Sequence, residues 1–381
     1  MEHVYFDHNA TTPVAETVLE AMLPYLRGEF GNASSRHEFG IAARRAVDRA
    51  RQQVAALVNV QPSQVIFVSG GTEANNLFIK GAAADLAPSQ IAVSAIEHPC
   101  VAKPAQELAR QGWKLRKLAV TRDGQLDLAD VDAALRVPTA IVSAMLVNNE
   151  TGVVLDVAAV ASRARAAKAL MHTDAVQALG KIPVDFQALN VHAMTISAHK
   201  LYGPKGAAAL VMDKRLHLRP IIHGGGHERG LRSGTENVAA IAGFGAACDL
   251  AASRMRELAQ RQEAMRARLE SGLSELGAVV FGEDAPRVAN TSYFAFKGMA
   301  GETLVIELDK AGYAVAPGAA CSSASPEPSA TLLAMGVDPE LSRGAVRFSL
   351  GAGNSMPQID DFLRALKTVV TRLRSLTAMA V

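Results

Sequence analysis

Residues 65–76 decide the fold, and they read Val65-Ile66-Phe67-Val68-Ser69-Gly70-Gly71-Thr72-Glu73-Ala74-Asn75-Asn76. The first four residues are apolar without interruption, as in a strand covered on both faces, and two glycines then lead into a helical pattern near residues 73–86. The same succession recurs along the chain. Further apolar runs lie at residues 91–96, 140–147, 169–172, 192–196 and 207–212, and further helical patterns lie near residues 38–58, 99–111 and 156–168. This alternation predicts an α/β domain with a mainly parallel sheet.

A different arrangement follows in the last third of the chain. A long helical pattern runs from about Asn237 to about Glu275. After it, strands are expected near residues 290–296, 313–316 and 345–350, and helices near residues 302–311 and 357–375. We place a domain boundary inside the long helix, near residue 255. The prediction is a large α/β domain over residues 14–255 and a small α+β domain formed by residues 1–13 and 256–381.

The composition excludes several classes of protein. The 381 residues include 39 Lys and Arg against 37 Asp and Glu, a net charge of +2, whereas a nucleic-acid-binding protein carries a clustered basic excess. Only three cysteines are present, Cys100, Cys248 and Cys321, which rules out a disulfide scaffold and suits a reducing compartment. The first residues lack the pattern of a signal peptide. The longest uncharged alanine-rich stretch, residues 238–248, is shorter than the ~20 residues that span a bilayer. We therefore expect a cytoplasmic protein with neither a nucleic-acid partner nor a membrane partner.

Chemically useful side chains follow several of the predicted strands, where ligands bind in open α/β sheets. Gly71 and Thr72 follow the first run, and a helix that begins at glycines offers free N–H groups to a phosphate. The alternative is a plain turn in which Thr72 caps the helix. Neither a Walker motif nor a G-x-G-x-x-G motif is present, so a nucleotide site has no support from these fingerprints.

Three more strand ends carry titratable groups. His98 follows residues 91–96. It is either an ordinary helix N-cap or a functional group that transfers protons or stacks on a planar cofactor. The nearby Cys100 is either a nucleophile or an ordinary residue in the first turn of a helix. Asp174 follows residues 169–172 and needs a cation, which is either a protonated pyridine nitrogen or a local arginine. Lys200 follows residues 192–196. Pyridoxal phosphate requires a Schiff-base lysine, an acidic partner for its ring nitrogen and a phosphate cradle, and this chain supplies all three.

The remaining candidates carry weaker signals. His223 and His227 lie in a glycine-rich segment, which favours a flexible loop over a metal site, so no metal is predicted. Cys248 lies on an alanine-rich helix and is expected to pack in the core. Cys321 lies among small residues and prolines, and on composition alone it is equally a reactive thiol or an incidental loop residue.

Taken in order, these segments resemble the pyridoxal-phosphate-dependent cysteine desulfurases of the NifS/IscS type. The resemblance runs nearly end to end. It is carried by residues 4–13, 30–35, 69–76, 97–98, 147–152, 173–177, 197–206, 223–235, 321–329 and 347–350. It implies the type I pyridoxal-phosphate fold, usually as a homodimer with the site at the subunit interface. In this chain the approach to Cys321, residues 316–320, lacks the family's usual serines and contains Pro317.

The resemblance also implies roles for individual residues. Lys200 would hold the cofactor, Asp174 would pair with its ring nitrogen and Gln177 with its ring oxygen, and His98 would stack on the ring and assist proton transfer. The phosphate would be held by Gly71, Thr72, Ser197 and His199, with Thr235 from the partner subunit. Asn149 would contact cofactor and substrate, and Arg347 would bind the substrate carboxylate through its planar fork.

The implied reaction removes sulfur from L-cysteine and leaves L-alanine, with Cys321 as the nucleophile that receives the sulfur as a persulfide. The persulfide would then pass to an acceptor protein, such as an iron–sulfur scaffold or a sulfur relay. Two rivals stay open at this point. One is a related aminotransferase or selenocysteine lyase that does not need Cys321, and the other is a non-catalytic protein that binds a cofactor or nucleotide.

Overall fold

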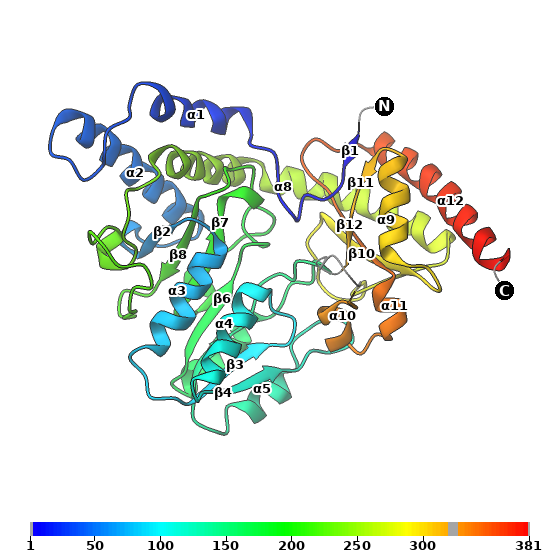
Figure 1. Cartoon of the computed structure of the whole chain (residues 1–381), viewed down its shortest axis with the longest axis horizontal. Coiled ribbons are helices and arrows are strands. Elements are labelled where there is room, and N and C mark those ends of the chain that lie inside the picture. Colours follow the sequence, from blue (N-terminus) through cyan, green and yellow to red (C-terminus); the bar gives the residue numbers. More distant parts are fainter. Residues whose placement is uncertain (1–2, 319–326, 380–381) are drawn as a thin grey trace.

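The computed structural model describes residues 3–318 and 327–379, and it contains a large domain and a small domain joined by one long helix (Figure 1). The large domain is built on a seven-stranded sheet of order β2-β8-β7-β6-β5-β3-β4. Its strands are β2 (Val65–Val68), β3 (Gln90–Ser94), β4 (Lys114–Leu118), β5 (Thr139–Ser143), β6 (Leu170–Asp174), β7 (Ala193–Ser197) and β8 (Ala208–Met212). Only β8 runs antiparallel to its neighbours, β2 and β7. The predicted α/β fold with a mainly parallel sheet is confirmed.

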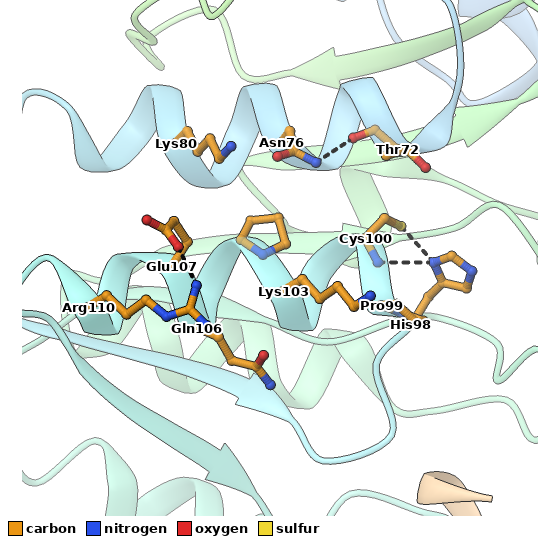
Figure 2. Close-up of a pocket in the computed structure, with 11 residues that line it drawn as sticks. Thr72, Asn76, Lys80, His98, Pro99, Cys100, Lys103, Gln106, Glu107 and Arg110 are labelled. Carbon is orange, nitrogen blue, oxygen red and sulfur yellow. Dashed lines mark hydrogen bonds and ion pairs between the residues drawn. The ribbon is translucent and has the colours of Figure 1, made fainter. Parts of the chain in front are cut away.

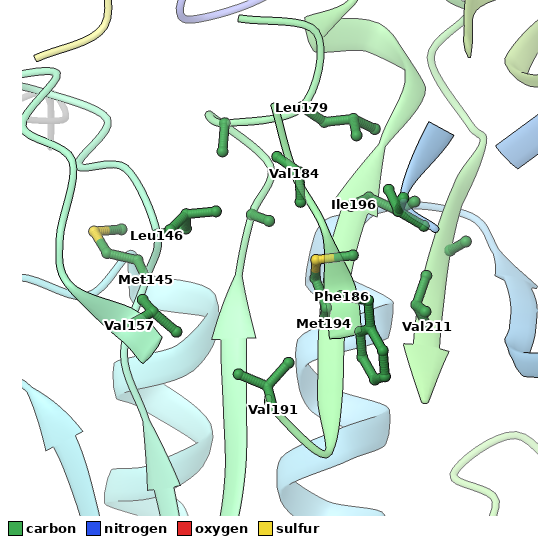
Figure 3. Close-up of a cluster of buried hydrophobic side chains, with 14 of the residues drawn as sticks. Met145, Leu146, Val157, Leu179, Val184, Phe186, Val191, Met194, Ile196 and Val211 are labelled. Carbon is green, nitrogen blue, oxygen red and sulfur yellow. The ribbon is translucent and has the colours of Figure 1, made fainter. Parts of the chain in front are cut away.

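Helices cover both faces of this sheet, which explains the continuous apolar runs. Ile66 and Val68 of β2 face a core that also contains residues of α3 and α4, while Val65 and Phe67 face a core that contains residues of α2, α6 and α8. The second core extends over β7 and β8, where Met194, Ile196 and Val211 pack together (Figure 3). The helices of this domain are α1 (Glu16–Arg27), α2 (Glu38–Leu57), α3 (Gly71–Ala83), α4 (Pro99–Arg110), α5 (Leu128–Ala134), α6 (Val157–Ala166), α7 (Phe186–Leu189) and α8 (Val238–Glu275).

The small domain surrounds a four-stranded sheet of order β12-β13-β10-β9. Its core is rich in phenylalanine, and Phe6 packs against both Phe348 and Phe362. The N-terminal strand β1 pairs with β11 at this end of the molecule, so the chain starts in the small domain before it enters the large one (Figure 1). The elements here are β1 (Val4–Tyr5), β9 (Ala278–Val280), β10 (Thr291–Phe296), α9 (Gly301–Lys310), β11 (Tyr313–Ala314), β12 (Ala316–Pro317), α10 (Ala330–Ala334), α11 (Pro339–Arg343), β13 (Ala345–Ser349) and α12 (Met356–Met379).

Helix α8 links the two domains. Its N-terminal part packs on α1 and α2, and its C-terminal part packs on α12 and β9. By length and composition alone it could cross a membrane, but Phe244, Ala247 and Cys248 are buried in the large-domain core. Cys248 therefore packs in the core as predicted. The domain boundary near residue 255 falls within this helix and stays a prediction.

The sequence patterns missed the elements that lack a continuous apolar run. The edge strand β4 reads Lys-Leu-Arg-Lys-Leu and exposes its charged side chains, so it carries no signal of a buried strand. The expected strand at residues 313–316 is instead two short strands in different sheets, because β11 pairs with β1 and β12 pairs with β13. In the second pair Ala316 lies opposite Arg347, so the residues just before the Cys321 segment belong to the small sheet.

Candidate active site

A cavity of about 260 Å³ lies at the edge of the large sheet where its parallel strands end. Nine of the residues predicted from the sequence line it: Gly71, Thr72, His98, Asn149, Asp174, Gln177, Ser197, His199 and Lys200. They come from five separate segments of the chain, and the shared direction of β2, β3, β5, β6 and β7 brings them together. Cys100, Met145, Val147 and Val176 complete the wall. The strand ends therefore do form one site.

One end of the cavity is suited to a phosphate. Helix α3 begins after Gly70, and no side chain caps its first N–H groups. Thr72 lies inside the helix and Gly70 is the N-cap, so the alternative in which Thr72 caps the helix is wrong. Nearby, the hydroxyl oxygen of Ser197 is buried without a hydrogen-bond partner in the described part of the chain. A phosphate here would receive both the helix N–H groups and this hydroxyl.

Asp174 places a buried carboxylate in the cavity. It accepts hydrogen bonds from the side-chain amide of Asn75 (2.7 Å) and the backbone N–H of Val176 (2.9 Å). Burial raises the pKa of Asp174, whereas these hydrogen bonds and the charges of His98 and Lys200 lower it. No arginine contacts Asp174 among the described residues, so the alternative of a local Asp–Arg pair is wrong. A cationic ring nitrogen in the cavity would supply the missing partner.

Lys200 stands at the end of the short 3-10 turn that follows β7. Its ammonium donates to the backbone carbonyl oxygens of Asn9 and Ala10. Burial, followed by the charge of Arg347, lowers the pKa of Lys200 to about 8, although Asp7 and Asp174 act in the opposite direction. A lysine with this pKa is more readily deprotonated than a surface lysine, as a Schiff-base nucleophile needs to be.

His98 is both a helix cap and a cavity residue, while its acid–base or ring-stacking role stays a prediction. It is the N-cap of α4, where Nδ1 accepts from the backbone N–H of Cys100 (3.2 Å), and its ring also lines the cavity. Partial desolvation and Lys200 lower the pKa of His98, and Asp174 raises it. Burial also lowers the pKa of the neighbouring His199, to about 4.

Gln177 is fixed from both ends of its amide. Its nitrogen donates to the backbone oxygen of Asn9 (2.9 Å), and its oxygen accepts from the ammonium of Lys181 (2.6 Å). Lys181 also donates to the side-chain oxygen of Asn9 (2.7 Å). One amide hydrogen of Gln177 stays available for a ring oxygen. Asn9, in the N-terminal segment, thus accepts hydrogen bonds from Gln177, Lys181 and Lys200.

Two of the predicted residues, Arg347 and Thr235, do not line this cavity. Arg347 of β13 lies behind it, where it pairs with Asp7 (2.7 Å) and donates to the backbone oxygen of Asn149 (3.1 Å). Its Nε atom is buried without a partner in the described residues, so part of its fork is free. Thr235 is exposed, in the loop before α8. Cys321 lies outside the described residues.

A larger groove of about 580 Å³ runs between α3 and α4 beside the cavity (Figure 2). The two share Thr72, His98 and Cys100. The outer part of the groove is lined by Lys80, Lys103, Glu107 and Arg110, of which Glu107 and Arg110 pair with each other. The acid–base groups that suit catalysis are concentrated in the smaller cavity.

These residues fit pyridoxal phosphate. The uncapped start of α3 and the unpartnered Ser197 hydroxyl suit its phosphate, Asp174 suits its ring nitrogen, and Lys200 suits its aldehyde. Fold and site together define a pyridoxal-phosphate-dependent enzyme of the type I fold.

The comparisons with known proteins agree with this class. The family model for class-V aminotransferases matches residues 4–362. Cysteine desulfurase 2 of Trichormus variabilis is 41% identical over 382 residues, which cover 99% of this chain and 95% of that protein. The cysteine desulfurase IscS of Anaeromyxobacter dehalogenans is 43% identical over 383 residues, covering 99% and 94%. A solved NifS-like protein superposes with a TM-score of 0.92 at 36% identity, covering 97% of this chain and 99% of its own. The chain belongs to the class-V aminotransferase family, whose members named here depend on pyridoxal phosphate.

The sequence reasoning left several residues around this site without a role. Asn9 and Asn75 lie inside motifs quoted for the resemblance, yet nothing in their spacing shows that they contact Lys200 and Asp174. Lys181 reads as a surface lysine beside a turn. Cys100 was left between two readings. The contact between Cys100 and His98 is evident only in the structure.

Proposed function

We propose that this enzyme is a cysteine desulfurase, which converts L-cysteine to L-alanine and receives the released sulfur on Cys321 as a persulfide. The observation that carries the proposal is the convergence of Lys200, Asp174 and His98 on one cavity beside an uncapped helix N-terminus. The curated relatives named cysteine desulfurase, which this chain matches over nearly its whole length, support the choice of substrate.

Each residue performs a task that its surroundings support. Lys200 would hold the cofactor through its amine, and Asp174 would pair with the ring nitrogen and favour its protonated form. When bound, pyridoxal phosphate withdraws electrons from the α-carbon of the amino acid. His98 moves protons at the mouth of the cavity, and the free part of the Arg347 fork binds the substrate carboxylate. Gln177, held by Lys181, orients the ring oxygen.

The sulfur step uses the thiolate of Cys321. Its sulfur forms a bond to the sulfur of L-cysteine, and the carbon–sulfur bond of the substrate breaks. The electron pair of that bond stays with the three-carbon fragment, which takes up a proton and leaves as alanine. The terminal sulfur of the persulfide then passes to an acceptor protein, which we propose is an iron–sulfur scaffold or a sulfur relay.

We further propose that the enzyme is a cytoplasmic homodimer in which Thr235 of each subunit completes the phosphate site of the other. The exposure of Thr235, away from the cavity of its own chain, supports this assignment.

The test is a turnover assay with L-cysteine and dithiothreitol that measures alanine and sulfide together. We expect equal amounts of both products from the wild-type protein, and no turnover from Lys200→Ala. Cys321→Ala should lose sulfide production while it retains the yellow cofactor, and mass spectrometry of the wild-type Cys321 peptide should show one added sulfur. If Cys321→Ala retains turnover, the enzyme is instead a lyase or aminotransferase that does not need this thiol. Protein that stays colourless with pyridoxal phosphate would refute the enzyme reading.

A further inference from the structure

Cys100 connects two residues of the active site that lie on different elements. Its sulfur is 2.8 Å from Nδ1 of His98 and 2.9 Å from the side-chain nitrogen of Asn75 (Figure 2 shows the contact with His98). The same nitrogen of Asn75 is 2.7 Å from the carboxylate of Asp174. A continuous set of contacts therefore runs from Asp174 through Asn75 and Cys100 to His98.

The direction of these hydrogen bonds follows from the groups involved. The backbone N–H of Cys100 can only donate, and it points to Nδ1 of His98, so Nδ1 is an acceptor and the neutral ring carries its proton on Nε2. The amide nitrogen of Asn75 can also only donate, so the sulfur accepts from it. Thr72 also forms a side-chain hydrogen bond that lowers the pKa of Cys100, so it acts as a donor to the sulfur as well, and the thiol hydrogen is directed to Nδ1 of His98.

The surroundings keep the thiol protonated. Burial raises the pKa of Cys100 to about 12, and Asp174 raises it further, while Asn75 opposes them. Cys100 is thus suited to be a hydrogen-bond donor, not a nucleophile. Asn75 is itself fully buried, so the position of the sulfur is fixed from the α3 side.

We propose that Cys100 is a positioning residue for His98: its thiol, held by Asn75, is a second donor to Nδ1 beside the backbone N–H, and the two donors together keep the proton of the neutral imidazole on Nε2. Nε2 has no hydrogen-bond partner in the described part of the chain, so it is the nitrogen left to exchange protons in the cavity. This role rests on the proposed function, in which His98 transfers protons. A histidine that acts as an acid–base group must present one defined nitrogen to its substrate.

Other charged groups also act on His98, and the test must leave them in place. Asp174 of β6 favours its protonated form and Lys200 disfavours it. Glu97 precedes it in the chain, and Lys103 lies one turn further along α4 in the same groove. Replacing Cys100 alone changes none of these charges.

The first experiment follows His98 directly by nitrogen NMR of the full-length protein labelled at histidine, with and without pyridoxal phosphate. His98→Asn identifies the signals of His98 among those of the ten histidines. The wild-type ring should be the Nε2–H tautomer. Cys100→Ala should raise the pKa of His98 by roughly 0.5 to 1 pH unit, because the neutral ring loses one donor. Cys100→Ser, which keeps a donor, should restore it, and Cys248→Ala, a change at a remote core cysteine, should leave it unaltered.

The second experiment measures turnover of L-cysteine. Cys100→Ala should lower kcat about tenfold with little change in KM, and Cys100→Ser should recover most of the loss. An unshifted His98 titration in Cys100→Ala, or a serine variant that behaves like the alanine variant, would overturn the proposal. If the NMR results hold but the wild-type protein releases no alanine, the positioning role stands and the proposed function fails.

Discussion

At the scale of single residues, the site combines groups whose pKa values are shifted by burial in useful directions. The pKa of Lys200 is lowered and that of Asp174 is raised by burial, with their mutual attraction acting against both shifts. The site therefore holds an amine that loses its proton near pH 8 and a buried carboxyl group that a cation would stabilise. Both features belong to a site prepared for a cationic ring and an aldehyde.

The lowered pKa of Lys200 predicts how the apoprotein takes up its cofactor. Only the neutral amine attacks an aldehyde, so the rate of attachment should rise with pH and level off above about 8. An unperturbed lysine would continue to gain rate beyond pH 10. Stopped-flow absorbance of apoprotein mixed with pyridoxal phosphate measures this rate, and Lys200→Ala is the control. A rate that still climbs steeply above pH 9 would contradict the burial effect.

The buried carboxyl group of Glu97, beside His98, leads to a second prediction, which concerns the pH dependence of stability. Burial raises its pKa to about 8, Asp174 adds to the shift, and one carboxyl oxygen has no partner in the described residues. In the unfolded chain the Glu97 carboxyl has its ordinary pKa of 4.5. Below that pH it is protonated in both the folded and the unfolded state and does not lower the free energy of unfolding. Above about pH 8 it is ionised in both states, and its full destabilising effect on the folded state is present. Glu97→Gln should therefore stabilise the protein by about 1–3 kcal/mol at pH 8 and by much less at pH 4.5. Thermal unfolding at both pH values checks this, and equal effects at the two would refute it.

At the scale of elements, the loop after β5 connects the cofactor site to the small domain. Glu150 follows Asn149 in that loop and accepts hydrogen bonds from Thr331 (2.9 Å), Tyr293 (3.0 Å) and Ser329. Ser329 is the N-cap of α10, so one carboxylate secures the start of that helix against β10 and the wall of the site.

Replacing Glu150 should therefore loosen the contact between these elements. Glu150→Ala leaves three hydroxyl groups without their acceptor, and we expect a loss of about 2–4 kcal/mol in the free energy of unfolding. Thr331→Ala removes one of the same bonds and should cost only about 1 kcal/mol. Urea unfolding measured by circular dichroism compares the two variants. A loss in Glu150→Ala no larger than that in Thr331→Ala would show that the shared acceptor contributes little.

At the scale of the whole molecule, the proposed dimer decides whether the phosphate site is complete. Thr235 is exposed on its own chain, whereas a phosphate ligand must reach the cavity. In a dimer with twofold symmetry, the Thr235 loop of each subunit would reach the cavity of the other subunit.

This arrangement predicts complementation between two defective variants. Lys200→Ala and Thr235→Ala should each be poorly active alone. Each mixed dimer formed on co-expression contains one site with both Lys200 and Thr235 intact, so purified mixed dimers should recover about half of wild-type turnover. Alanine release from purified mixed dimers, separated with two different tags, measures the recovery. No gain over the sum of the separate variants would place Thr235 in the site of its own chain or outside any site.

The strand-end side chains could be predicted from the sequence because their position depends on local pattern. A parallel sheet brings all of its carboxyl ends to one edge, so Gly71, His98, Asp174 and Lys200 had to be neighbours once the strands were recognised. The uninterrupted apolar runs likewise predicted that hydrophobic cores lie on both faces of the large sheet. The edge strand β4 could not be predicted because its side chains are mostly charged and exposed. The division of residues 313–317 into two strands could not be predicted because β11 pairs with β1, at the other end of the sequence, and β12 pairs with β13.

Only the tertiary structure decided which groups surround the catalytic candidates. Asn75 and Asp174 are 99 positions apart, and Arg347 and Asp7 are 340 apart, so no local pattern could join them. The pKa shifts of Lys200 and Glu97 likewise arise from burial, which depends on how α3, α4 and the N-terminal segment close over the sheet. Local periodicity therefore determines the scaffold and the residues at its active edge, while long-range packing determines their charge, their hydrogen bonds and the place of Cys100 among them.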